Sequence, residues 1–361
     1  MAMFEHDESA SREALCQRVL GHFVPQVVPL RTTYLGNSGG FSGARIWRVV
    51  TEFGDFALRR WPNPVLPEAR IRGLHRLLSY LRREGLTCLS VPLPAREGAT
   101  VVQEGGHLWQ LEPWLPGTAD FLEQPRPERL RAAMQTLAQL HLAAERYHPD
   151  VESAEWFACQ PRQYSPAVRE RLQILDRIER RIAVMDASVL GSPLSPLREL
   201  AQRILHFIRL GRGMATAQLN AVREVEFRLH PCLRDVWHDH LLFIEDRVTG
   251  VIDPSACRSD HVACDLSRLI GSLVGNDGEQ RDIALSEYQR YRPLTVSELQ
   301  LVDALDRSGV LLSGWTWLEW IYAERRAFAD LDGVQQRMNL ILKRMESLID
   351  DQPTRQFLVL P

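Results

Sequence analysis

The stretch from Leu233 to Pro254 restricts the fold more than any other part of the chain. Two β-rich runs, 241–244 and 248–252, flank a polar triplet at 245–247, a pattern typical of a hairpin. A loop rich in aspartate and histidine precedes the first run, and an aspartate follows the second. Because antiparallel strands bring their outer ends together, we expect four polar residues to lie close to one another: Asp235, Asp239, His240 and Asp253. Such a cluster is costly unless a metal or an electrophile compensates it, so it predicts a functional site.

Spacing separates the roles of these acidic residues. The fifth residue after Asp235 is His240, which still lies in the loop and is able to bind a metal. The fifth residue after Asp239 is Ile244, an apolar strand position that is not. A loop aspartate, a metal-binding side chain five residues later and a hairpin that ends in aspartate are typical of phosphoryl transfer. In this interpretation Asp235 deprotonates the attacking hydroxyl, and His240 and Asp253 hold Mg²⁺ on the nucleotide phosphates.

The N-terminal part of the chain offers matching features for a nucleotide. A glycine-rich segment at 36–44 separates two β-rich runs, and its backbone N–H groups are able to close over phosphates. Glycine-rich hairpin turns are also common without a nucleotide, so this segment alone decides little. In the run 56–61, strand alternation places Ala57 and Arg59 on one face, as an adenine and phosphate site requires. Glu68, at the start of the next predicted helix, is available to pair with Arg59.

The order of predicted elements indicates an α+β protein with two lobes. Residues before Pro113 are mostly strand-like, apart from a helix over 66–84, and the chain breaks at the prolines of 113–117. Later segments have helical periodicity. They predict helices over 127–146, from Ser165 and Pro166 onward, and over about 196–210, with Gly211 beyond the end of the last of these. After the hairpin, helices are predicted over 265–274, 281–291, 297–326 and 333–349. We therefore predict a small β-rich lobe at 1–112 and a helical lobe at 113–361.

Taken together, these features resemble the aminoglycoside phosphotransferase family, a branch of the protein-kinase-like fold that includes choline and homoserine kinases. The resemblance covers roughly residues 30–325. It is carried by the glycine loop, the run 57–60, the break at 112–117, the run 137–141 and above all the stretch from Asp235 to Asp265. It implies a two-lobed kinase-like fold, ATP or GTP as the phosphoryl donor, Mg²⁺ or Mn²⁺, and a small-molecule hydroxyl as the acceptor.

The resemblance also implies a role for each matching residue. Asp235 becomes the catalytic base, His240 and Asp253 the metal ligands, and Asp265 the brace of the catalytic loop. The residues implied at the nucleotide are Gly39, Gly40, Phe41, Ser42, Arg59, Glu68, Glu112 and Trp114.

Two positions depart from the family pattern. The family often has a lysine where this chain has Arg59, and the only lysine here is Lys343. His240 stands where the family has asparagine, and an imidazole suits Mn²⁺ or Zn²⁺ better than Mg²⁺. A nucleotide-binding pseudokinase is therefore the first alternative to an active kinase.

A zinc protein is the second alternative. Seven possible ligands lie within 35 residues, namely His230, Cys232, His238, His240, Cys257, His261 and Cys264. They lack the tight paired spacing of structural zinc sites. The six cysteines are instead typical of reduced thiols.

Composition excludes several other classes of function. The 361 residues carry a net charge of −3, which gives no electrostatic basis for a nucleic-acid partner. The chain lacks an apolar run long enough to span a membrane, and its acidic start lacks a leader pattern, so a cytoplasmic location is expected. Asp260 and Asp277 follow the hairpin and either attract a cationic acceptor or belong to the solvated surface. The acceptor and the oligomeric state stay open.

Overall fold

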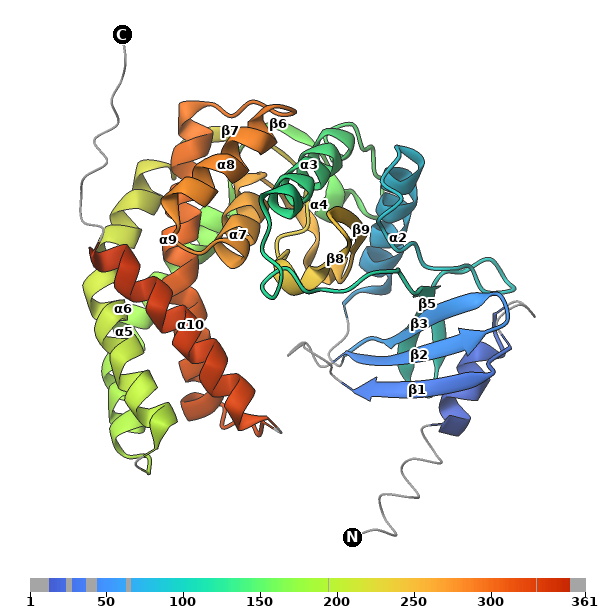
Figure 1. The fold of residues 1–361 in the computed structure, drawn as a ribbon, viewed down its shortest axis with the longest axis horizontal. Helices are drawn as coiled ribbons and strands as arrows, with labels where there is room; N and C mark the ends of the chain where they lie inside the picture. The colour runs from blue at the N-terminus through green and yellow to red at the C-terminus, as the bar shows by residue number, and fades with distance from the viewer. Residues whose placement is uncertain are drawn as a thin grey trace. The chain divides into compact units, whose positions relative to one another are not determined.

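The computed structural model describes residues 13–23, 28–36, 44–62, 66–193, 195–328 and 330–350 (Figure 1). The chain divides into two compact units. The first comprises Met1–Cys159 and His238–Ser259, and the second comprises Gln160–Trp237 and Asp260–Pro361. Asp235 therefore belongs to the second unit, and the hairpin that follows it belongs to the first. The lobe boundary between residues 112 and 113 stays a prediction.

The first unit contains a five-stranded antiparallel sheet in the order β1-β2-β3-β5-β4. Its strands are β1 (Arg31–Gly36), β2 (Arg45–Thr51), β3 (Gly54–Arg60), β4 (Val102–Glu104) and β5 (His107–Pro113). Buried residues alternate with more exposed ones along the second half of β2, as expected for a strand with one face on a core. The predicted sequence of strand, glycine-rich turn and strand is thus confirmed for its two strands.

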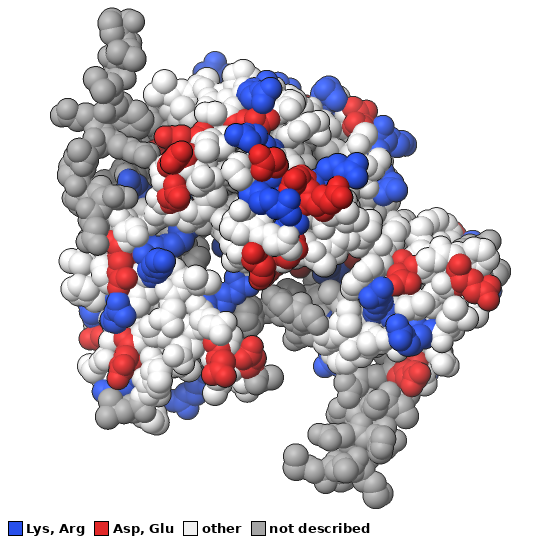
Figure 2. All heavy atoms as spheres, in the orientation of Figure 1, with Lys and Arg blue, Asp and Glu red and all other residues white. Residues whose placement is uncertain are grey.

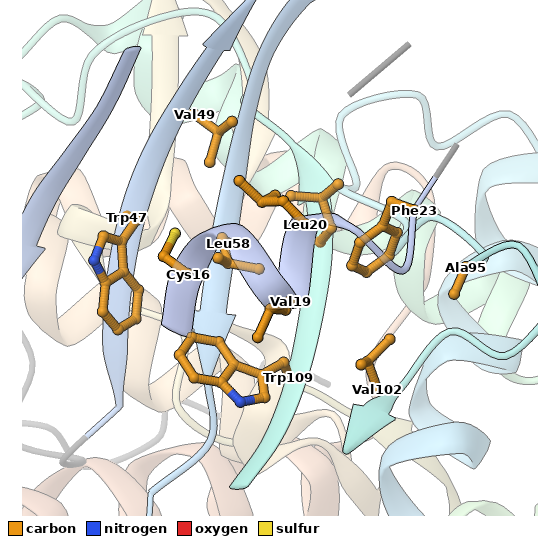
Figure 3. Close-up of a cluster of buried hydrophobic side chains, with 11 residues drawn as sticks. Cys16, Val19, Leu20, Phe23, Trp47, Val49, Leu58, Ala95, Val102 and Trp109 are labelled. Carbon is orange, nitrogen blue, oxygen red and sulfur yellow. The ribbon is translucent and has the colours of Figure 1, made fainter. Parts of the chain in front are cut away.

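One face of this sheet packs against a short helix at residues 13–20 (Figure 3). Cys16, Val19 and Leu20 belong to one buried cluster with side chains of four strands, β2, β3, β4 and β5. The strand residues of the cluster include Trp47, Leu58 and Trp109. The ring centres of Trp47 and Trp109 lie 5.3 Å apart. Leu58 of β3 and Trp109 and Leu111 of β5 belong to this cluster, so their burial fixes the two strands against the helix.

Three α-helices, a hairpin and two short 3₁₀ helices, η2 (His238–His240) and η3 (Pro254–Ala256), complete the described part of the first unit. The helices are α2 (Glu68–Arg83), α3 (Pro127–Ala144) and α4 (Ala154–Phe157), and the hairpin strands are β8 (Leu241–Ile244) and β9 (Arg247–Val251). The apolar stripe of α2 is buried as its spacing predicts. Gly73 permits the close approach of α2 to α4, because a Cβ there would overlap the side chain of Ser153.

The second unit is mainly helical. Its helices are α5 (Pro166–Leu190), α6 (Pro196–Ala221), α7 (Ala263–Leu273), α8 (Gly278–Gln289), α9 (Val296–Leu318), the short π-helical η4 (Glu319–Ala323) and α10 (Leu331–Asp350). Strand β6 (Gln160–Tyr164) pairs with β7 (Glu226–Cys232), and β10 (Arg258–Asp260) crosses from one unit to the other. Helix α9 packs against α5, α6, α7 and α10.

The predicted end of α6 near Gly211 is wrong. The helix continues to Ala221, and Gly211 is buried within it. A glycine inside a helix costs only about 1 kcal/mol relative to alanine, so packing against α5 and α9 is sufficient to keep the helix intact.

Charged side chains of both signs are interleaved over the face drawn in Figure 2. This distribution agrees with the small net charge of the chain. None of the helices in the described ranges is long and apolar enough to cross a membrane.

Candidate active site

The predicted hairpin is present, and its turn is one residue shorter than expected. Leu241 pairs with Val251 and Ile244 pairs with Arg247, so Arg247 belongs to the second strand. Glu245 adopts a left-handed conformation with φ 53°, which lets the chain reverse within two residues. The edge of the hairpin is fixed by the segment after β5, because Thr118 and Phe243 exchange two backbone hydrogen bonds of 3.1 and 2.9 Å. Gly117, with φ 108°, leaves room for this contact.

His240 and Asp253 meet at the open end of the hairpin, as the register requires. The last paired residue of β9 is Val251, and the N–H of Ile252 donates to the carbonyl oxygen of His240 at 3.0 Å, so Asp253 lies two residues beyond the paired strands. Asp253 adopts a left-handed conformation with φ 53°, unusual for a residue other than glycine. Burial alone would raise the pKa of Asp253, but the charges of Arg59 and His240 and the hydrogen bonds from Ser255 together outweigh burial and lower this pKa. The carboxylate is therefore ionised, as a metal ligand must be.

Arg59 projects from β3 and joins two carboxylates. Its Nη1 donates to Oδ1 of Asp253 at 3.1 Å, and its Nε lies 3.6 Å from Oε1 of Glu112. The side chains of Arg59 and Glu112 are only 9% and 10% exposed. Burial alone would lower the pKa of Arg59, but Asp253 and Glu112 reverse the effect and raise it. Burial raises the pKa of Glu112 despite the attraction of Arg59.

The ion pair expected between Glu68 and Arg59 is a wrong prediction. Among the described residues Glu68 instead pairs with Arg72, one turn later in α2, at 3.4 Å. The physical reason is burial: the Glu68 side chain is 44% exposed, whereas Arg59 lies inside the sheet beside Glu112 of the neighbouring strand. A direct contact of Glu68 with a nucleotide stays a prediction.

The remaining predicted nucleotide residues fall into two groups. Gly39, Gly40, Phe41 and Ser42 lie outside the described residues. Trp114 follows β5 and is partly exposed, with the guanidinium of Arg48 4.9 Å from the centre of its ring. The backbone N–H of Trp114 donates to the carbonyl oxygen of Asp55 at 2.9 Å, and Arg48 pairs with the Asp55 carboxylate. Trp114 is therefore anchored to the end of the sheet.

A buried chain of hydrogen bonds leads to Glu112 and was not predicted from the sequence. Nε2 of Gln110 donates to Oε2 of Glu112 at 3.2 Å. Oε1 of Gln110 lies 3.0 Å from Nε2 of His75 in α2 and accepts from Nε1 of Trp61 at 3.0 Å. Nδ1 of His75 lies 2.8 Å from Oγ1 of Thr100. Two polar residues, Gln110 and Glu112, in the run 108–113 of otherwise apolar residues were the available signal.

This chain gives His75 a measurable effect on stability. Burial, with a smaller contribution from Arg76 and Arg59, lowers the pKa of His75 to about 4. Its pKa in the unfolded chain is about 6.5, so the unfolded protein binds the proton first as the pH falls. Between pH 7 and pH 5 the free energy of unfolding should therefore lose about 2 kcal/mol through His75. Urea unfolding at both pH values measures this loss, which His75→Gln should remove; an unchanged loss in that variant would contradict the assignment.

In the second unit, Asp235 lies in the loop after β7. Its Oδ1 accepts from Nε of Arg268 at 3.1 Å, and its side chain is 54% exposed. Arg268 also lies 5.8 Å from the centre of the Trp237 ring, and Arg337 of α10 lies 4.0 Å from it. Asp235 is thus a solvent-accessible carboxylate held by a cation. Whether it converges with His240, Asp239 and Asp253 stays a prediction.

Asp265 braces this loop, as the resemblance implied. The carboxylate of Asp265, at the start of α7, accepts from the N–H of Leu233 at 2.8 Å and from the N–H of Arg234 at 2.5 Å. Arg234 has a left-handed conformation with φ 63°, and its guanidinium pairs with Glu170 at 2.6 Å. The two backbone bonds therefore hold the residues immediately before Asp235 in a strained turn.

Replacing this brace should destabilise the loop. Asp265→Asn keeps the size of the side chain but removes its charge and one acceptor, so we expect a loss of about 2 kcal/mol in the free energy of unfolding. Thermal and urea unfolding measure the loss, with Asp332→Asn at the exposed start of α10 as the control. Equal stability of the Asp265 and Asp332 variants would show that the two bonds contribute little.

Other residues singled out in the sequence have structural roles. Asp260 is fully buried and accepts from Ser165 Oγ and from the N–H of Ala167, so it does not belong to the solvated surface. Asp277 accepts from the N–H of Gln280 and caps α8. His261 lies 2.8 Å from the Glu298 carboxylate. These contacts are sufficient to explain the three polar residues, and no bound ligand is needed to explain them.

Comparisons with known proteins agree with the kinase-like fold. An aminoglycoside phosphotransferase of Alicyclobacillus acidocaldarius superposes with a TM-score of 0.64 at 17% identity, over 92% of this chain and 94% of that one. A spectinomycin phosphotransferase, solved with ADP and spectinomycin, gives 0.66 at 11% identity, over 93% and 97%. The predicted α+β, protein-kinase-like fold is thereby confirmed.

The family follows from the sequence comparison. The chain matches the model of the phosphotransferase enzyme family over residues 33–298, and it belongs to that family. A homoserine kinase of Cupriavidus metallidurans is 24% identical over 249 residues, and one of Agrobacterium fabrum is 24% identical over 244 residues. The match covers 65% of this chain and 65% of the length of the Cupriavidus enzyme.

Proposed function

We propose that this protein transfers the γ-phosphoryl group of ATP or GTP to a hydroxyl group of a small molecule. The observation that carries the proposal is the ionised Asp253 at the end of the hairpin, beside His240 and held by Arg59. A carboxylate and a cation in this arrangement suit the metal and the phosphates of a nucleotide. Membership of the phosphotransferase family supports the same reaction.

In the proposed reaction Asp235 is the base. It accepts the proton of the acceptor hydroxyl, whose oxygen forms a bond to the γ-phosphorus. The bond between that phosphorus and the bridging oxygen breaks, and ADP (GDP when GTP is the donor) leaves with the bonding electrons. Asp253 and His240 would hold a divalent metal, which neutralises charge on the phosphates when bound. The donor set of one carboxylate and one imidazole fits Mn²⁺ at least as well as Mg²⁺.

The acceptor is proposed as a hydroxyl-bearing metabolite rather than as an antibiotic in particular. The homoserine kinases named above support an amino-acid-sized acceptor, and the spectinomycin enzyme supports a larger one. Asp260 and Asp277 no longer argue for a cationic acceptor, because both are engaged in local hydrogen bonds.

The test is an assay of ADP release with a panel of acceptors. The panel contains L-homoserine, amino alcohols, choline and aminoglycosides, each with ATP or GTP and with Mg²⁺ or Mn²⁺. With at least one acceptor, the wild-type protein should release the nucleoside diphosphate faster than the Asp235→Asn variant does. Binding of the nucleotide without release for any acceptor would favour the second candidate.

The second candidate is a pseudokinase that binds a nucleotide without transferring phosphate. The ion pair between Arg59 and Asp253 favours it, because a guanidinium already occupies one oxygen of the proposed metal ligand. A zinc protein has less support, because Cys232 donates to the carbonyl oxygen of Asp260 and His261 lies against Glu298. Stoichiometric zinc that resists a chelator would restore the zinc alternative.

A further inference from the structure

A continuous line of polar side chains runs through the first unit from Thr100 to Asp253. Its successive contacts are Thr100 to His75 at 2.8 Å, His75 to Gln110 at 3.0 Å, Gln110 to Glu112 at 3.2 Å, Glu112 to Arg59 at 3.6 Å and Arg59 to Asp253 at 3.1 Å. The line joins α2, β5 and β3 to the end of the hairpin.

The hydrogen bonds along this line have one consistent direction. Oε1 of Gln110 accepts from Trp61, so the amide nitrogen of Gln110 is the atom that faces Glu112. His75 must then donate through Nε2 and accept from Thr100 through Nδ1, which is the pattern of a neutral imidazole. Reversing any one group would place two acceptors or two donors against each other. The line therefore has a single low-energy arrangement.

Burial makes these contacts specific rather than incidental. His75, Gln110, Glu112 and Arg59 are all buried. A buried polar group without a partner costs about 1–3 kcal/mol, so each member constrains the next. Solvent-exposed Glu68, in contrast, pairs only with the equally exposed Arg72 among the described residues.

We infer that Glu112 is the positioning residue for Arg59, and that Gln110 and His75 in turn hold Glu112 in place. The inference rests on the proposed function, because it assigns Arg59 to the nucleotide phosphates. In this arrangement α2 acts on the nucleotide site through the imidazole of His75 rather than through a glutamate on the helix. Arginine suits this role, because its fork reaches Glu112 through Nε and Asp253 through Nη1 at the same time.

The test compares the affinity of variants for ATP with Mg²⁺ by titration calorimetry. Glu112→Gln should weaken binding by about tenfold, because it removes a charge-assisted contact from a buried cation. Glu104→Gln, on the adjacent strand β4, changes a partly buried carboxylate that pairs with Arg18 and His22 outside the line of contacts, so it is the control and should bind like the wild type. A larger loss in Glu68→Gln than in Glu112→Gln would overturn the inference.

Two changes at residue 75 test the rest of the line. His75→Leu removes both polar atoms and should weaken binding by about threefold, whereas His75→Gln keeps a donor toward Gln110 and should recover most of the loss. A purely structural role would lower the melting temperature of both variants without changing the affinity of the folded protein. Equal affinity for ATP in the wild type, Glu112→Gln and His75→Leu would overturn this inference and leave the proposed function intact. Failure of the wild type to bind ATP would instead overturn the proposed function.

Discussion

Asp235→Asn is expected to reduce kcat by about 10²–10⁴-fold while leaving the affinity for ATP nearly unchanged. The amide has the size of the carboxylate but is unable to accept the proton of the acceptor hydroxyl. The Asp235 carboxylate is solvent-accessible and pairs with Arg268, whereas Arg59 pairs with Asp253, so the change removes no partner from the pair between Arg59 and Asp253. Single-turnover rates and calorimetric titration measure the two quantities separately.

The matched control for this prediction is Asp246→Asn in the hairpin turn. It removes one carboxylate from a partly exposed position that pairs with Arg126. We expect it to keep the wild-type rate. Full activity of Asp235→Asn would remove Asp235 from the mechanism, and a parallel loss of ATP affinity would indicate that the loop had been disrupted instead.

Asp253→Asn should abolish the metal-dependent part of nucleotide binding. The proposed metal would lose its only carboxylate ligand within the hairpin, so we expect the affinity for ATP with Mg²⁺ to fall by more than about 100-fold. Arg59 would at the same time lose one of the two carboxylates that balance its charge. Titrations with and without the metal should give nearly the same affinity in this variant.

The lowered pKa of Asp253 adds a pH dependence to the same prediction. Because Arg59 and His240 keep this pKa below the ordinary carboxyl value of about 3.9, Asp253 stays ionised throughout the neutral range. A decline of activity between pH 8 and pH 6 should therefore arise from another group. Metal-dependent binding that still vanished near neutral pH in His240→Asn, which has no imidazole to protonate, would contradict the assignment of Asp253.

The periodicity and turn chemistry of the sequence were sufficient for most of the fold. The hairpin, the strands around the glycine loop and the stripe of α2 depend on local patterns, and the structure contains each of them. The end of α6 was missed because it depends on packing with α5 and α9, which a local pattern does not report. Gly211 was treated as a stop signal, yet it is buried inside the helix.

The candidate site shows the same limit. Spacing along one strand and one loop was enough to place His240 beside Asp253. The partner of Arg59 required the pairing of β3 with β5, in which Glu112 lies opposite Ala57 and Gln110 lies opposite Arg59. His75 was not singled out in the sequence, and only the position of α2 relative to β5 reveals its hydrogen bond to Gln110. Contacts between distant segments therefore carried the information that the sequence lacked.

The most direct test of phosphoryl transfer follows both products of the reaction for the best acceptor of the panel. Mass spectrometry detects the phosphorylated acceptor, and a coupled assay counts ADP. Phosphoryl transfer predicts one phosphorylated acceptor for each ADP, with both products lost together in Asp235→Asn. ADP without a phosphorylated acceptor, or equal amounts of both products from the wild type and from Asp235→Asn, would contradict it.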